Sequence, residues 1–256
     1  MKAAIITIAG ISSRFNEGIP ANEQCQKALY YQGNKDNTLL FHLLNKCLFA
    51  DRIMLVCGNR FNEVKDYYAL LPKNVKEKTE LVYNEHYEDL SSGYSLYVGI
   101  KALFEKYKDI EEVLFVEGDL DVDDASFQKV VESSKDVLTY SFEPIYANKA
   151  VVLYSNAENR YKYAFNSSHG LLQIEEPFSV ILNSGQIWKF KNAERLKAAN
   201  EKFYNENKED SNLGIIRNYV DASDSREFDL VGLLRWTNCN TRDDYQKILG
   251  YWEENV

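Results

Sequence analysis

The first residues that could do chemistry lie in IITIAGISSRF, residues 5–15, where an apolar run leads into a loop with one arginine. The backbone amides of such a loop, helped by Gly10, can wrap phosphate oxygens. Arg14 adds a forked donor for the same oxygens. The pattern is not the dinucleotide fingerprint GxGxxG, because Ser12 replaces its second glycine, and it is not a P-loop. An ordinary turn with a surface arginine has the same residues, so other segments must decide.

A single lysine follows a long polar segment, residues 16–26. Such a segment could fold over a ligand and bring the ammonium of Lys27 to its phosphates. The alternative is a solvated lysine, which is what most lysines are. Lys27 is therefore a candidate phosphate-binding residue only together with the first loop.

A run of acids, FVEGDLDVDD, occupies residues 115–124 at the end of an expected buried strand. Strand alternation would put Glu117, Asp119 and Asp121 on one face. Carboxylates at a strand end, facing a phosphate-binding loop, suit Mg²⁺. The alternative is a solvated acidic turn that caps the next helix. Given the first loop, we favour the metal site.

The elements that must position these segments alternate up to about residue 135, as in a parallel, layered α/β sheet. The expected strands are 2–9, 51–58, 80–84 and 111–119, and the expected helices are 38–49, 62–71 and 95–107. Ligands of such sheets bind where the carboxyl ends of the strands meet the loops. Later segments predict antiparallel strands and hairpins, with helices at 192–207 and 241–255. We therefore expect one domain, 1–256, with a β-rich second half.

Composition disfavours several classes of function. The net charge is −9 and the pI about 5.0, whereas nucleic-acid binders usually carry a basic face. The four cysteines form no CxxC pair, and no charged leader or membrane-length apolar stretch is present, so we expect a cytoplasmic protein with reduced thiols and no membrane insertion. The three histidines are scattered, which argues against a histidine-based triad or metal site.

Several segments, in order along nearly the whole chain, resemble nucleotidyltransferases of the MobA-like and sugar-phosphate type. They are AAIITIAGISSRF (3–15) with QKALYY (26–31), LVYNEHYEDLSSGYSLYVGIKAL (81–103), LFVEGDLDV (114–122), NSGQIWKFKNAERL (183–196) and WTNCNTRDDYQKI (236–248). The segments 183–196 and 236–248 are most similar to the CTP:phosphocholine cytidylyltransferase branch.

The resemblance implies a Rossmann-like, three-layer nucleotidyltransferase fold with a mostly parallel sheet. Residues 1–135 would bind the nucleotide and 136–256 the acceptor. The phosphate of a small acceptor would attack the α-phosphorus of CTP or another NTP, with Mg²⁺ as cofactor and pyrophosphate as leaving group. The implied catalytic residues are Arg14, Lys27 and Asp119; the nucleotide-binding residues are Ala9, Gly10, Ser12, Ser13, Asn84 and Ser95; the metal ligands are Asp119 and Asn240.

Three positions depart from the family pattern. Gln26 stands in place of the usual proline before the lysine. Asn238 and Asn240 stand where the phosphocholine branch has Glu and Asp, so Asn240 would offer the metal a neutral oxygen. Glu176 stands where sugar-phosphate members often have lysine, which disfavours a hexose phosphate.

The second half is rich in tyrosine and acid, and these residue types suit an ammonium headgroup through cation–π and charge pairing. The predicted acceptor-binding residues are Glu175, Glu176, Trp188 and Tyr146. A phosphorylated amino-alcohol, a phosphonate amine or an amino acid amide is then the expected acceptor, with CTP as donor. The alternative is that these aromatics pack hairpins.

Two other functions stay open. The sequence DLD, residues 119–121, matches the DxD motif of GT-A glycosyltransferases, which use nucleotide sugars. Gln26 and Asn240 would also suit a non-catalytic nucleotide sensor. The nucleotidyl transfer that the resemblance implies needs positioning and charge neutralisation rather than a covalent nucleophile.

Overall fold

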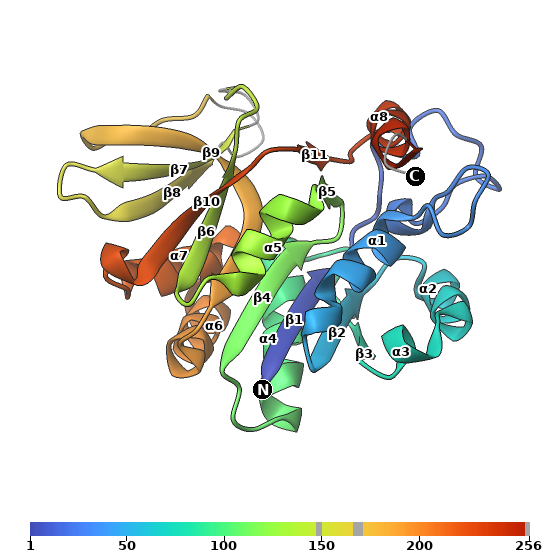
Figure 1. Cartoon of the computed structure of the whole chain (residues 1–256), viewed down its shortest axis with the longest axis horizontal. Coiled ribbons are helices and arrows are strands. Elements are labelled where there is room, and N and C mark those ends of the chain that lie inside the picture. The colour runs from blue at the N-terminus through green and yellow to red at the C-terminus, as the bar shows by residue number, and fades with distance from the viewer. Residues whose placement is uncertain (147–149, 166–170, 254–256) are drawn as a thin grey trace.

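A computed structural model describes residues 1–146, 150–165 and 171–253. Its centre is a nine-stranded sheet in the order β10-β6-β9-β4-β1-β2-β3, with β7 paired to β9 and β8 to β7 (Figure 1). The strands are β1 (Lys2–Thr7), β2 (Arg52–Cys57), β3 (Thr79–Tyr83), β4 (Glu112–Glu117), β6 (Asp136–Ser141), β7 (Val151–Asn156), β8 (Tyr161–Phe165), β9 (Phe178–Phe190) and β10 (Phe228–Leu233). A separate antiparallel pair joins β5 (Leu120–Val122) to β11 (Trp236–Asn238).

Helices cover both faces of the sheet, which makes three layers. They are α1 (Leu39–Lys46), α2 (Phe61–Leu70), α3 (Lys73–Lys76), α4 (Ser92–Lys106), α5 (Asp124–Glu132), α6 (Ala193–Asn207), α7 (Leu213–Asp221) and α8 (Arg242–Glu253). In β1, Ala3 and Ile5 pack in the core with α4, α6 and α7, whereas Ala4 and Ile6 pack in the core with α1, α2, α3 and α5. The apolar run of β1 therefore reflects burial on both sides.

The first half follows the predicted alternation. Strands β4, β1, β2 and β3 are all parallel, so their carboxyl ends share one edge. Helix α4 begins at Ser92, three residues before the predicted start, and this places its first turn at that edge.

The second half extends the same sheet through the long strand β9. Its end pairs antiparallel with β4 and β6, and its beginning pairs with β7. Strands β10 and β6 pair in parallel, unlike the hairpins expected there. Both predicted halves thus contribute strands to one sheet.

Helix α8 closes the edge of the sheet above the first loop (Figure 1). Its buried Tyr245 and Trp252 cluster with Phe15 of that loop, and the Arg242 guanidinium lies over the Phe15 and Tyr30 rings. The C-terminal helix therefore fixes the loop that precedes Lys27.

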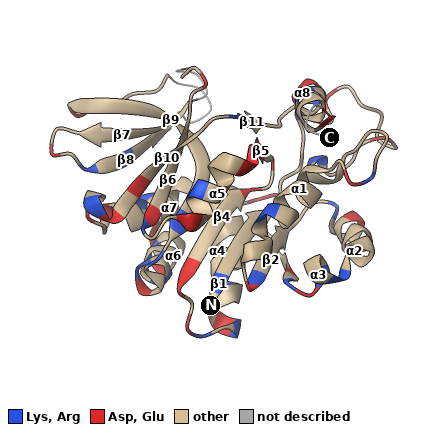
Figure 2. Cartoon of the chain, in the orientation of Figure 1, with Lys and Arg blue, Asp and Glu red and all other residues tan. Residues whose placement is uncertain are grey.

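Figure 2 shows Lys and Arg interspersed with Asp and Glu over the described elements. Among the helices of the described chain, none has the length and apolar character needed to cross a membrane.

Candidate active site

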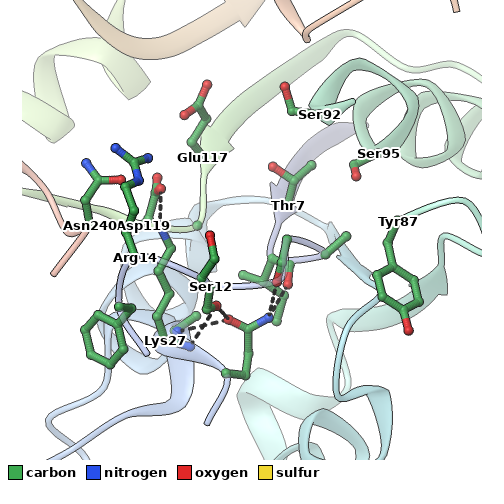
Figure 3. A pocket seen from close by; sticks show the side chains of 18 of the residues that line it. Thr7, Ser12, Arg14, Lys27, Tyr87, Ser92, Ser95, Glu117, Asp119 and Asn240 are labelled. Atoms are coloured by element: carbon green, nitrogen blue, oxygen red, sulfur yellow. Dashed lines mark hydrogen bonds and ion pairs between the residues drawn. The ribbon is translucent and has the colours of Figure 1, made fainter. Parts of the chain in front are cut away.

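A cavity of about 250 Å³ opens at the carboxyl ends of β1 and β4 (Figure 3). Three segments far apart in sequence surround it: the loop after β1, the first turn of α4, and the turn after β4. Nine residues singled out for catalysis, nucleotide or metal binding line it, namely Ala9, Gly10, Ser12, Ser13, Arg14, Lys27, Ser95, Asp119 and Asn240. The predicted convergence of the loop, the lysine and the acid is therefore observed.

The carboxamide of buried Gln26 holds the first loop in shape. Its Nε2 donates to the carbonyls of Ile8 at 2.6 Å and Gly10 at 3.3 Å, and its Oε1 accepts from the Ser12 hydroxyl at 3.0 Å. Ser12 has a φ of 60°, a left-handed conformation that is rare for serine and is stabilised here by that contact. The Ser12 hydroxyl also accepts from the amide of Lys27. Gln26, which departs from the family pattern, thus connects the loop to Lys27.

Lys27 reaches across the cavity to the end of β4. Its ammonium donates to Asp119 Oδ2 at 2.6 Å, while Asp119 Oδ1 is buried without a partner in the described residues (Figure 3). Figure 3 places Arg14 and Asn240 beside this pair. Two cations and a carboxylate of the predicted set are thus adjacent.

Glu117 is a second carboxylate of the cavity. Burial, together with the nearby negative charge of Asp119, raises the pKa of Glu117 to about 7. Its Oε1 accepts from Asn212 Nδ2 at 2.6 Å. Near neutral pH this group changes charge easily, so an approaching cation would favour its ionised form.

The first turn of α4 supplies hydroxyl groups. Ser92 and Ser95 line the cavity, and the positive end of the helix dipole lies with them. Asn84 is fully buried and donates to Ser95 Oγ at 3.0 Å. Asn84 does not line the cavity, so it positions Ser95.

A second cavity of about 690 Å³ adjoins the first. It lies between the sheet edge, the β7–β9 region and the start of α8. Six residues line both cavities: Arg14, Ser92, Glu117, Asp119, Asn212 and Asn240. The two spaces therefore meet at the acidic end of β4.

The predicted acceptor-binding residues do not come together. Tyr146 lines the second cavity. Trp188 borders it but is fully buried, stacks on Phe115 and donates its indole N–H to Tyr163, so it is a core residue. Glu175 and Glu176 line neither cavity, and Glu176 instead accepts from Tyr154. Trp188 therefore follows the alternative that the sequence left open, in which aromatic side chains pack the strands.

The expectation that Asp121 shares a face with Glu117 and Asp119 is wrong. Strand β4 ends at Glu117, and a turn separates it from β5. Asp121 lies in β5, where its carboxylate is almost fully buried, pairs with Arg235 and accepts from Trp252 Nε1. Only the first acid of DLD faces a cavity, which removes the basis for a DxD site.

Sequence reasoning missed Asn212 and Ser92, and it treated Gln26 only as a departure. Asn212 precedes α7 and reaches Glu117 from 95 residues away. No local sequence pattern predicts that contact. Ser92 had a signal, since a serine pair precedes the apolar spacing of the predicted helix.

The family comparison identifies the chain. The model of a family described as a domain of unknown function, DUF6564, matches residues 23–252. The chain belongs to this family. No curated protein matches the DUF6564 chain.

Solved structures share the fold of this DUF6564 member. The inositol-1-phosphate CTP transferase from T. maritima superposes with a TM-score of 0.65 at 16% identity, covering 96% of this chain and 94% of that one. The CTP:phosphocholine cytidylyltransferase from Streptococcus pneumoniae gives 0.59 at 15% identity, covering 96% and 97%. A UDP-glucose pyrophosphorylase gives 0.69 at 10% identity over 100% of both chains. The predicted Rossmann-like nucleotidyltransferase fold is therefore confirmed.

The donors present fit a magnesium ion. No group of three or more His, Cys, Asp or Glu side chains in the described ranges would cage a metal. Mg²⁺ does not require one, because it usually binds one or two carboxylates together with substrate phosphates and waters. Asp119, with its unpartnered buried Oδ1, and Glu117 supply carboxylates, and Asn240 supplies an amide oxygen.

Proposed function

We propose that this DUF6564 protein is a Mg²⁺-dependent nucleotidyltransferase. It couples an NTP, with CTP as the expected donor, to a small phosphorylated or phosphonate acceptor and releases pyrophosphate. The observation that carries the proposal is the junction of two cavities at Arg14, Glu117, Asp119 and Asn240. A reaction between two bound phosphates needs such a junction.

The nucleotide would occupy the first cavity and the acceptor the second. The amides of the Gly10 loop and the hydroxyls of Ser92 and Ser95 would hold the triphosphate. An acceptor phosphate oxygen attacks the α-phosphorus, and the bond from that phosphorus to the pyrophosphate oxygen breaks. Arg14 and Lys27 neutralise charge on the phosphates, which is the main requirement of phosphoryl chemistry.

Mg²⁺ would be held by Asp119, with Glu117 and Asn240 near it, and would supply positive charge that neutralises the phosphates. The unpartnered Asp119 Oδ1 supports this assignment. We further propose a cytoplasmic role in making a surface-glycan or headgroup precursor.

The test is pyrophosphate release with each of the four common NTPs and a panel of phosphorylated small molecules. Asp119→Ala and Lys27→Ala should each lower kcat/KM at least about 100-fold, as for loss of a transition-state contact. Asp124→Ala is the matched control, because Asp124 lies outside both cavities and its side chain is 91% exposed. Full activity of Asp119→Ala would contradict the proposal.

Other outcomes would select the alternatives. Tight NTP binding without turnover across the panel would favour a nucleotide sensor. Transfer from a nucleotide sugar, without pyrophosphate chemistry, would favour a glycosyltransferase.

A further inference from the structure

The second cavity is lined by carboxamides where it lies away from the cavity junction. Asn183, Gln186 and Asn238 line this part. The charged side chains of the described lining there are Glu143, Asp244 and Lys247. Glu143 and Lys247 are exposed, and Asp244 Oδ2 accepts from the backbone amides of Asn240 and Thr241. The three carboxamides therefore offer a bound ligand neutral groups that both donate and accept hydrogen bonds.

Gln186 and Asn238 form an incomplete pair. Asn238 Nδ2 donates to Gln186 Oε1 at 3.0 Å. Asn238 Oδ1 is buried and has no partner in the described residues. If the nitrogen and oxygen of both carboxamides were exchanged, Gln186 would donate to Asn238. The buried amide nitrogen of Asn238 would then lack a partner in place of its oxygen, so one polar atom of Asn238 has no partner in either assignment. Buried polar atoms without partners are rare in folded proteins, and this one lies beside a cavity.

The backbone presents Gln186 in an unusual way. Its φ is 56°, in the left-handed region, next to a register shift between β6 and β9. Glutamine rarely adopts this conformation, and such residues cluster at ligand sites. Trp236 Nε1 donates to the carbonyl of Gly185 at 2.8 Å, which fixes the indole beside the pair.

We propose that this part of the cavity binds a neutral polyol, so that the acceptor is a sugar or cyclitol phosphate. The proposal rests on the proposed transferase function. Ligand hydroxyls complete the hydrogen bonding of Gln186 and Asn238, with Trp236 offering an apolar wall. A hydroxyl both donates and accepts, as a carboxamide requires.

An ammonium headgroup fits this surface less well. A quaternary ammonium donates no hydrogen bond, and a primary ammonium cannot accept one. Of the acids predicted for the acceptor, Glu175 and Glu176 line neither cavity. Away from the junction, the acids of the described lining are Glu143, which is exposed, and Asp244, whose Oδ2 already accepts from the backbone amides of Asn240 and Thr241.

The test compares myo-inositol 1-phosphate and glucose 1-phosphate with phosphocholine and phosphoethanolamine. Turnover is followed by pyrophosphate release, and Kd by calorimetry with Mg²⁺ and a non-hydrolysable NTP analogue. We expect kcat/KM to be at least about tenfold higher for one of the polyol phosphates. Asn238→Ala should lower that value about 100-fold and raise Kd, because hydroxyl recognition by paired polar groups discriminates strongly.

Gln186→Gly should act in the same direction, since glycine tolerates the positive φ but removes the amide. KM for the NTP should stay unchanged in both variants. Glu209→Gln changes an exposed acid that lines neither cavity, so it is the control and should leave polyol turnover unchanged. Asn238→Asp should also lower polyol turnover, since it replaces a donor with a charge.

Three results would overturn the inference: a preference for the ammonium compounds together with loss in Glu143→Gln, unchanged polyol Kd in Asn238→Ala, or no binding of either polyol phosphate. Turnover of ammonium acceptors alone would sink this inference and leave the transferase standing. Polyol binding that depends on Asn238, without pyrophosphate release, would sink the transferase and support the ligand class.

Discussion

The ammonium of Lys27 lies 2.6 Å from Asp119 Oδ2, across 92 residues of sequence. The two side chains are 19% and 18% exposed, so the pair is largely shielded from water. Lys27 therefore sits on the carboxylate that we propose for Mg²⁺. In the nucleotide-free chain the ammonium and a metal ion would compete for this carboxylate, and phosphates that draw Lys27 away would release Asp119.

The first prediction tests this competition. Lys27→Ala should bind Mn²⁺ alone about tenfold more tightly than the unmodified protein, equivalent to about 1.4 kcal/mol, since the competing cation is gone. Electron paramagnetic resonance titration of free Mn²⁺ measures this without activity. Lys46→Ala is the control, because Lys46 pairs with Asp124 outside the cavities. Unchanged or weaker Mn²⁺ binding in Lys27→Ala would contradict the competition.

Two glycines make a matched pair. A Cβ on Gly10 would meet no atom within 4 Å, whereas one on Gly118 would lie 2.6 Å from the Thr7 carbonyl oxygen. Gly10→Ala should keep its melting temperature but weaken NTP binding about tenfold, because the methyl fills space proposed for phosphate. Gly118→Ala should lower the melting temperature by several degrees, as overpacking costs about 1–3 kcal/mol. Thermal unfolding with and without NTP distinguishes them, and undiminished NTP affinity in Gly10→Ala would remove the loop from the site.

Trp188 tests the distinction between core and ligand contacts. Trp188→Ala should lower the free energy of unfolding by about 3–5 kcal/mol, because it empties a fully buried site. Trp188→Phe keeps a ring against Phe115 and should cost less. Urea unfolding gives both values. A large rise in acceptor KM for Trp188→Phe at normal stability would instead place Trp188 in the acceptor site.

His42 predicts a pH dependence of stability. Its ring stacks on Trp252 at 3.8 Å, and burial, with Lys46 and Arg235 nearby, lowers its pKa to about 4. The unfolded chain, with a pKa near 6.5, binds more protons below that pH, so stability falls as pH drops from 6.5 to 4. This group should cost up to about 2 kcal/mol between pH 7 and 5.

His42→Phe keeps a ring against Trp252 and cannot titrate. Urea unfolding at pH 7 and pH 5 should show a smaller loss of stability for this variant than for the unmodified protein. Equal losses would show that His42 is protonated in the folded chain.

Much of the fold was predictable from local patterns. The run at β1 and the spacing of Leu40, Leu43 and Leu44 in α1 predict a doubly covered parallel sheet, and the structure has one. The parallel β6–β10 pair was not predictable, because β10 lies far from β6 in sequence and has no hairpin signal.

The site was predictable only for residues whose loops end at the same sheet edge. Arg14, Lys27 and Asp119 meet there because strand order fixes where those loops emerge. Asp121 broke the alternation rule because a turn, not a continuous strand, follows Glu117. Glu176 carried the right residue type for an acceptor site, but it lies in the segment before β9, where it accepts from Tyr154 and lines neither cavity.

By itself, the sequence determined the layered α/β sheet, the phosphate-type loop and the acidic strand end, because these depend on the order and spacing of neighbouring residues. Only the tertiary structure decided that Gln26 holds the loop, that Asn212 reaches Glu117, and that Gln186 and Asn238 line the second cavity. The contacts of Asn212, Gln186 and Asn238 involve residues positioned by α7, β9 and β11. Their distances depend on how the sheet closes, and no local pattern encodes them.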